Sequence, residues 1–85
     1  MMKILWDEPK REANLFKHHL DFADLDANFF DHALIQPSHS KRWRAIGKNG
    51  QGVISVVFFA LGQEAISVIS MRPASRYERK LYAER

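Results

Sequence analysis

The carboxyl-terminal segment that begins at residue 69 combines side chains that bind phosphate with side chains that exchange protons. Its cationic, acidic and phenolic members include Arg72, Arg76, Arg79, Lys80, Glu78 and Tyr82. A guanidinium group stays charged and binds phosphate oxygens in a fork, while Glu and Tyr can move protons once their surroundings adjust their pKa values. These residue types could therefore bind a phosphodiester and act on it without a metal ion.

Three strands, the last of which overlaps the start of this segment, should form an antiparallel meander. The expected strands are 41–47, 52–60 and 64–71, and the expected two-residue turns are Asn49-Gly50 and Gly62-Gln63. Such turns would pair Trp43 with Val56 and Ala45 with Ile54, which defines an apolar face for the sheet.

The opposite face of this predicted sheet gathers arginines and hydroxyls. The register places Arg44, Ser55 and Ser70 in one cross-strand row, with Arg42 and Arg72 on its two sides. An antiparallel sheet commonly keeps one face wet, which suits Arg and Ser without any function. However, no strand carboxylate accompanies these cations, so they repel one another unless an anion binds. Both interpretations, a solvated face and an anion site, stay open.

The amino-terminal half should supply helices for the apolar face. A strand at 3–6 precedes Asp7, the expected N-cap of a helix over 8–18. A second helix should begin with Asp21 as N-cap and end near Asp31.

This second helix should bury Phe22, Leu25 and Phe29, and a loop through 36–39 should follow it. With a last helix over 75–82, the predicted fold class is α+β in the order β-α-α-β-β-β-α. It would consist of an antiparallel sheet with two helices packed on one face and a C-terminal helix.

Composition narrows the class of protein. A chain of 85 residues suits a single domain, and the absence of Cys excludes thiol catalysis and favours a reducing, cytoplasmic setting. Residues 1–34 carry four Lys/Arg against seven Asp/Glu, whereas residues 35–85 carry nine against three, so the second half is the candidate surface for a polyanion. Neither a signal peptide nor a membrane-spanning run is expected.

Three further motifs of fixed spacing span most of the chain. The first is a W-D-x-x-K-x-x-x-N-x-x-K-H pattern made by Trp6, Asp7, Lys10, Asn14, Lys17 and His18. The second is an R-W-x-x-I-G pattern at Arg42, Trp43, Ile46 and Gly47, and the third is a terminal pattern at Ile69, Ser70, Arg72, Ala74, Glu78, Arg79 and Tyr82. Together the three motifs resemble those of the BrnT toxins, although the chain departs from that family at His19, where Gly is usual, and at Pro73, where a basic residue is common.

The resemblance implies a single BrnT/RelE-like toxin domain over residues 1–85, the ribonuclease half of a bacterial type II toxin-antitoxin pair. It implies that the protein inhibits translation by cutting RNA, and that a BrnA-type ribbon-helix-helix antitoxin neutralises it. Operator DNA would be bound only through this antitoxin, and no membrane is involved.

A metal-independent ribonuclease must activate the ribose 2′-hydroxyl, stabilise a charged phosphorane and protonate the leaving oxygen. We expect Arg44 and Arg72 to clamp the phosphate, with Glu78 or His18 as base and Tyr82 or His18 as acid. The expected RNA-binding residues are Arg42, Arg76, Arg79, Lys80 and Lys17.

Two alternatives accompany these roles. Ser75 and Glu78 have the spacing of a capping box, which would give Glu78 a structural task instead of a chemical one. The same Arg-rich surface would also serve a non-catalytic RNA- or protein-binding module that has lost cleavage. No cofactor or metal is expected, because His18 and His19 diverge on a helix and lack a third ligand at suitable spacing.

Overall fold

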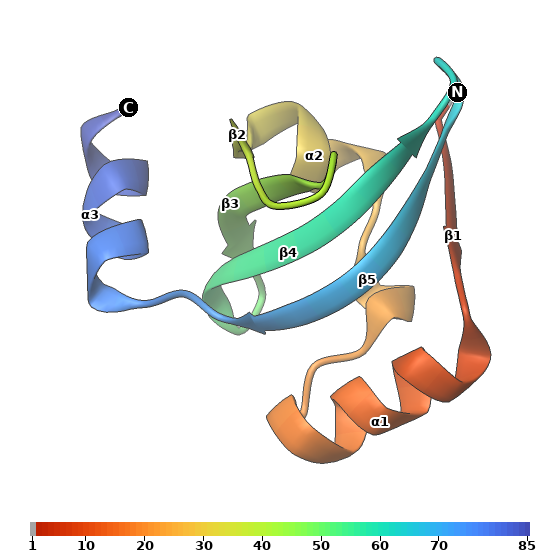
Figure 1. Ribbon diagram of the computed structural model, residues 1–85. Helices are drawn as coiled ribbons and strands as arrows, with labels where there is room; N and C mark the ends of the chain where they lie inside the picture. Colours follow the sequence, from red (N-terminus) through yellow and green to blue (C-terminus); the bar gives the residue numbers. More distant parts are fainter. Residues whose placement is uncertain (1) are drawn as a thin grey trace.

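Five strands form one mixed sheet in the computed structural model, which describes residues 2–85 (Figure 1). Their spatial order is β1-β5-β4-β3-β2. The elements in chain order are β1 (Lys3–Trp6), α1 (Glu8–His18), the 3₁₀ helix η1 (Phe22–Asp24), α2 (Ala27–His32), β2 (Leu34–Pro37), β3 (Trp43–Asn49), β4 (Gly52–Leu61), β5 (Ala65–Pro73) and α3 (Arg76–Glu84). Within residues 2–85, no helix is both long and apolar enough to cross a membrane.

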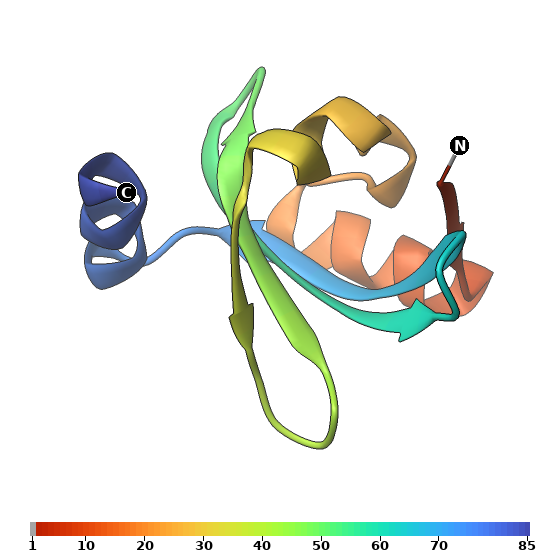
Figure 2. The ribbon, with the colours of Figure 1, turned by 90° about the horizontal axis from the view of Figure 1, so that it is seen from above.

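Helices lie on both sides of the sheet, since α1 and α2 occupy one side and α3 the other (Figure 2). The main core lies under α2 and η1, where the predicted Phe22, Leu25 and Phe29 are all buried. Gly47 permits the close approach of Phe29, because a Cβ at this glycine would come within 2.8 Å of the phenyl ring. Burial of this apolar surface stabilises the fold at about 25 cal/mol per Å².

The predicted second helix is interrupted, and its continuous form was wrong. Leu25 is extended, and Asp26 starts a new helix by accepting a hydrogen bond from the Phe29 N–H at 2.8 Å. Asp21 does cap the first part, accepting from the Ala23 N–H at 2.9 Å. Two capping aspartates five positions apart therefore divide the segment, because Asp side chains compete for backbone donors.

The expected loop through residues 36–39 was wrong for Gln36 and Pro37, which belong to β2 and pair with β3, and it was confirmed for Ser38 and His39. The turn between these strands places Ser40 and Lys41 at φ 56° and 64°. Hairpin turns with two positive φ values usually carry Asn-Gly, and neither residue is present here to signal one.

The sheet is not purely antiparallel, since β1 runs parallel to β5 from Lys3 opposite Ala65 to Trp6 opposite Val68. The observed order therefore contains an additional strand and a parallel edge. The predicted order β-α-α-β-β-β-α lacked β2, and the prediction of an antiparallel sheet was wrong at β1.

The predicted register was wrong at both turns. Asn49 pairs with Gly52, so Gly50 and Gln51 form the first turn, and Gly52 takes a φ of 116°. As a result Trp43 lies opposite Phe58 and Ala45 opposite Val56.

The second turn is longer than predicted, because Leu61 pairs with Ala65. A bulge at Val57/Phe58 then shifts the register between β4 and β5 once more. Ser55 consequently lies opposite Arg72, and Ser70 lies opposite Val57. The predicted row of Arg44, Ser55 and Ser70 does not form.

Helix ends agree with the sequence more closely. α1 covers the predicted 8–18, although Asp7 occupies its N-cap without a side-chain hydrogen bond. His19 takes the left-handed conformation in which a glycine is common, with φ 58°, and its N–H donates to the Leu15 carbonyl. α3 begins with the predicted capping box of Ser75 and Glu78.

Candidate functional site

An arginine–glutamate cluster, made by Arg44, Ser55, Arg72 and Glu78, joins β3, β4, β5 and α3. Arg72 donates from both terminal nitrogens to the two carboxylate oxygens of Glu78, at 2.8 and 3.0 Å. Arg44 approaches the same carboxylate at 3.4 Å and donates to the Ser55 hydroxyl. One carboxylate thus faces two guanidinium groups.

Glu78 is held at this point by the start of α3. Its Oε1 accepts from the Ser75 backbone N–H at 2.9 Å, while its own N–H donates to the Ser75 hydroxyl at 3.1 Å. Burial of the Glu78 carboxyl raises its pKa. Hydrogen bonds from Arg72 and the Ser75 backbone, with the charges of Arg72 and Arg44, outweigh burial and lower this pKa from 4.5 to about 2.

The cluster changes the expectation of an open face of unpaired arginines. Glu78 is the anion that lies between two of them, so mutual repulsion does not by itself require a bound ligand. The cluster still has one more positive than negative charge, and the Arg72 side chain is 36% exposed. A phosphate group could therefore approach Arg72 from solvent, whereas a carboxylate with a pKa of about 2 is a weak proton acceptor at neutral pH.

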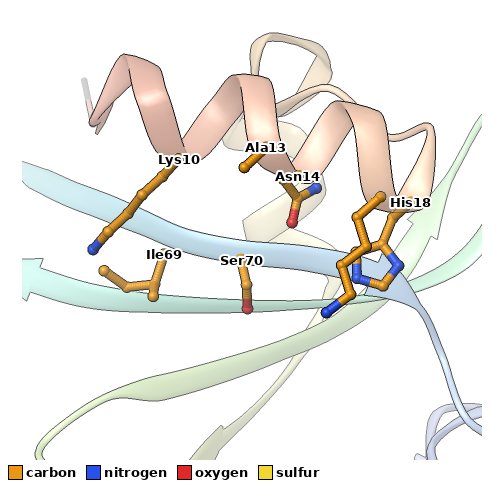
Figure 3. A pocket seen from close by; sticks show the side chains of 7 residues that line it. Lys10, Ala13, Asn14, His18, Ile69 and Ser70 are labelled. Carbon is orange, nitrogen blue, oxygen red and sulfur yellow. The ribbon is translucent and has the colours of Figure 1, made fainter.

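A pocket of about 280 Å³ lies between α1 and β5, and the predicted His18 and Lys17 line it. The other lining residues are Lys10, Ala13, Asn14, Ile69 and Ser70. Figure 3 shows Lys10 above Ile69 at one end and His18 at the other, where β5 continues toward α3.

Asn14 fixes the wall of this pocket to the sheet. Its Oδ1 accepts from the Met71 N–H at 3.0 Å, and its Nδ2 donates to the Leu20 carbonyl at 3.2 Å. Lys10, Asn14, Lys17 and His18 are spaced so that they share one face of α1, and the structure shows that this face meets β5.

The remaining predicted residues do not join the cluster through any hydrogen bond or salt bridge described for residues 2–85. Tyr82 lies under Arg85, whose guanidinium carbon is 3.8 Å from the ring centroid. Arg79 donates to the Ala74 carbonyl at 3.1 Å, and Arg42 lies 5.2 Å from the centre of the Phe59 ring. Arg76 and Lys80 are exposed on α3.

Comparison with known proteins supports the resemblance seen in the motifs. Residues 6–78 match the model of a family described as the ribonuclease toxin, BrnT, of type II toxin-antitoxin systems. The chain belongs to the BrnT family. The matched range contains the α1 motif, Arg44, Arg72 and Glu78, and it ends before Arg79, Lys80 and Tyr82.

A solved structure agrees with this family membership. The chain is 55% identical to the Brucella abortus ribonuclease toxin BrnT, whose crystal structure superposes with a TM-score of 0.82. The match covers 89% of this chain and 100% of the Brucella chain. A search of curated proteins found no match.

Proposed function

We propose that this BrnT family member is a metal-independent endoribonuclease, a hydrolase that inhibits translation by cutting RNA. The observation that carries the proposal is the pair formed by Arg44 and Arg72, which lies on the sheet inside the region matched by the ribonuclease family. Two guanidinium groups around one point are suited to the charge that develops on a phosphorane. The RelE-like relationship stays a prediction.

In the proposed mechanism, Arg72 binds the scissile phosphate through its exposed edge and Arg44 supports the charge that develops in the transition state. Glu78 acts as a positioning residue, because it aligns both arginines and its low pKa makes it a poor base. The proton acceptor is then His18, whose side chain lies at the end of the α1–β5 pocket that points toward α3. Tyr82 remains the candidate donor to the leaving 5′-oxygen.

RNA outside the scissile position would meet the basic residues Arg42, Arg76, Arg79, Lys80 and Lys17. We further propose that a BrnA-type antitoxin with a ribbon-helix-helix domain covers part of this surface in the cytoplasm. Membership of a type II toxin-antitoxin family supports a protein partner of this kind. Operator DNA would be contacted through the antitoxin alone.

The decisive experiment incubates purified protein with single-stranded RNA in EDTA and analyses the ends of the products. Attack by the 2′-hydroxyl predicts 2′,3′-cyclic phosphate ends and resistance of an RNA that carries a 2′-deoxy sugar at the cut position. Cleavage that stops in EDTA and returns with Mg²⁺ would contradict the metal-independent mechanism. RNA binding without cleavage would favour the non-catalytic module.

The partner is tested by expression in bacteria. Growth arrest and loss of protein synthesis are expected, and co-expression of the neighbouring gene should relieve both. Arrest that persists although the neighbouring protein is made would contradict the proposed antitoxin.

A further inference from the structure

The pocket between α1 and β5 exists because β1 is shorter than β5. Their pairing ends at Trp6 and Val68, so the edge of β5 beyond Val68 has no strand beside it. At Met71 the side chain of Asn14 occupies the position of the missing strand and accepts a hydrogen bond from the Met71 backbone N–H. The pocket wall is therefore a helix anchored to a strand edge by a buried polar side chain.

The charges around this pocket have one sign. Its charged lining residues are Lys10 and Lys17, and it contains no carboxylate. Among residues 2–85, the salt bridges involve Arg11, Arg44 and Arg72, and neither lysine takes part. Two lysines that form no salt bridge within residues 2–85 therefore line the same pocket as the Ser70 hydroxyl, a combination that suits an anion.

The pocket is next to the arginine–glutamate cluster along β5. Ser70 and Arg72 are two positions apart without a bulge between them, opposite Val57 and Ser55, so their side chains emerge on the same face of the sheet. A rise of about 3.3 Å per residue puts their Cα atoms roughly 6.6 Å apart. The His18 end of the pocket is the end toward α3 (Figure 3).

We propose that this pocket is a backbone subsite for the phosphodiester next to the one that is cut. Lys10 and Lys17 would neutralise this second phosphate and Ser70 would donate to it, while Ile69 would contact its sugar. The subsite rests on the proposed ribonuclease function, but it contributes to binding and not to bond cleavage. Since this subsite would recognise only the charge of the phosphate, it would bind RNA of any sequence.

The first test measures binding of a single-stranded RNA whose 2′-O-methyl riboses prevent cleavage. Wild-type protein is compared with the double variant Lys10→Ala/Lys17→Ala at several salt concentrations. Binding should weaken about tenfold or more at low salt, and the steepness of log K against log salt should fall by about 0.7, the value for one phosphate contact on a single strand. The control is Lys3→Ala/Lys48→Ala, which removes two exposed lysines from β1 and β3.

Unchanged affinity and slope in the pocket variant would overturn the subsite, and so would an equal loss in the control. Circular dichroism of each variant checks that the fold is retained.

The second test locates the contact on the RNA. A neutral methylphosphonate is placed at one linkage at a time, and neutralising the linkage beside the cut position should weaken binding to wild-type protein. The same RNA should bind the pocket variant with no additional loss, because the contact is already absent. Additive losses would overturn the proposal. Cleavage by the wild-type protein in EDTA is measured separately, so failure of the ribonuclease function is distinguished from failure of the subsite.

Discussion

Two bidentate arginine–carboxylate pairs with nearly the same hydrogen-bond distances occur in the two halves of this molecule. Arg11 donates to both oxygens of Asp21 at 2.8 and 3.1 Å, and Arg72 donates to both oxygens of Glu78 at 2.8 and 3.0 Å. In each pair the carboxylate also caps a helix, since Asp21 accepts from Ala23 and Glu78 accepts from Ser75. Pair geometry alone therefore does not separate a structural site from a functional one.

The difference lies in what surrounds each pair. Arg11 contacts a second carboxylate, Glu8, so that group has an excess of negative charge. Glu78 contacts a second arginine, Arg44, so its group has an excess of positive charge. An RNA phosphate is repelled by the first group and attracted by the second, because the surplus charge decides the sign of the local field.

The largest expected effect is on RNA cleavage. Arg72→Ala should lower kcat by about a hundredfold to a thousandfold, the usual effect of losing one transition-state donor. The matched variant Arg11→Ala should keep the cleavage rate of the folded protein, since its surroundings do not attract phosphate. Equal losses in both variants would remove the functional distinction between the pairs.

The second effect is on stability and its dependence on pH. Glu78→Gln keeps a capping-box residue and removes the charge. It should lower the free energy of unfolding at neutral pH by roughly 3 kcal/mol, which corresponds to a pKa of about 2 in place of 4.5.

The direction in which the free energy of unfolding changes with pH follows from the lowered pKa of Glu78. The stabilisation is present above the ordinary pKa of 4.5 and is lost as the pH falls toward about 2, where the wild-type carboxyl becomes protonated. Urea denaturation of both proteins should therefore give converging stabilities in acid. Asp21→Asn should show the same trend within about 1 kcal/mol, because water screens the Asp21 carboxylate, which is 24% exposed against 10% for Glu78. A difference between the Glu78 proteins that stays constant in acid would contradict an electrostatic cause.

The third prediction distinguishes the contribution of the helix cap at Ser75 from that of the ion pairs of Glu78. Ser75→Ala removes the acceptor for the Glu78 N–H and should cost about 1 kcal/mol in urea denaturation. Asp26→Ala, which removes the cap of α2, is the matched control and should cost a similar amount. Cleavage should be retained in the folded Ser75 variant because the two arginines still hold Glu78. Loss of cleavage as large as that of Arg72→Ala would show that the cap positions the site.

The smallest effect is expected for Glu8→Gln. Its exposed pair with Arg11 spans one helical turn, so its loss should change stability by about 0.5 kcal/mol or less. RNA affinity should not rise, although the surplus negative charge is removed, because Arg11 then only balances Asp21 and no surplus positive charge is created. A clear gain in RNA affinity would mean that surplus charge alone controls binding.

Local structure was predictable where local chemistry controls it. β1 and α1 have the predicted limits, and Ser75 with Glu78 forms the predicted cap of α3. Each of these features depends on residues within a few positions of one another. The buried Phe22, Leu25 and Phe29 were also correct, although the helix that carries them is divided, because burial depends on apolar character more than on continuous helix.

The register and the site were less predictable. Gly52 takes the positive φ that moves the first turn by one residue, and a bulge at Val57/Phe58 shifts the pairing again. Between β4 and β5, the three-residue turn after Leu61 and this bulge together place Arg72, and not Ser70, opposite Ser55. The partnership of Arg44 and Arg72 with Glu78 could not be foreseen either, because a strand-face argument did not include a carboxylate from the following helix.

By itself, the sequence determined the caps, the apolar stripes, the basic second half and the motifs that identify the family. Only the tertiary structure decided that Glu78 lies between Arg44 and Arg72, and that Asn14 takes the place of a strand at the edge of β5. The physical reason is distance along the chain. Caps and periodicity act over a few residues, whereas these contacts join residues 6 to 57 positions apart and depend on turn geometry and strand length throughout the sheet.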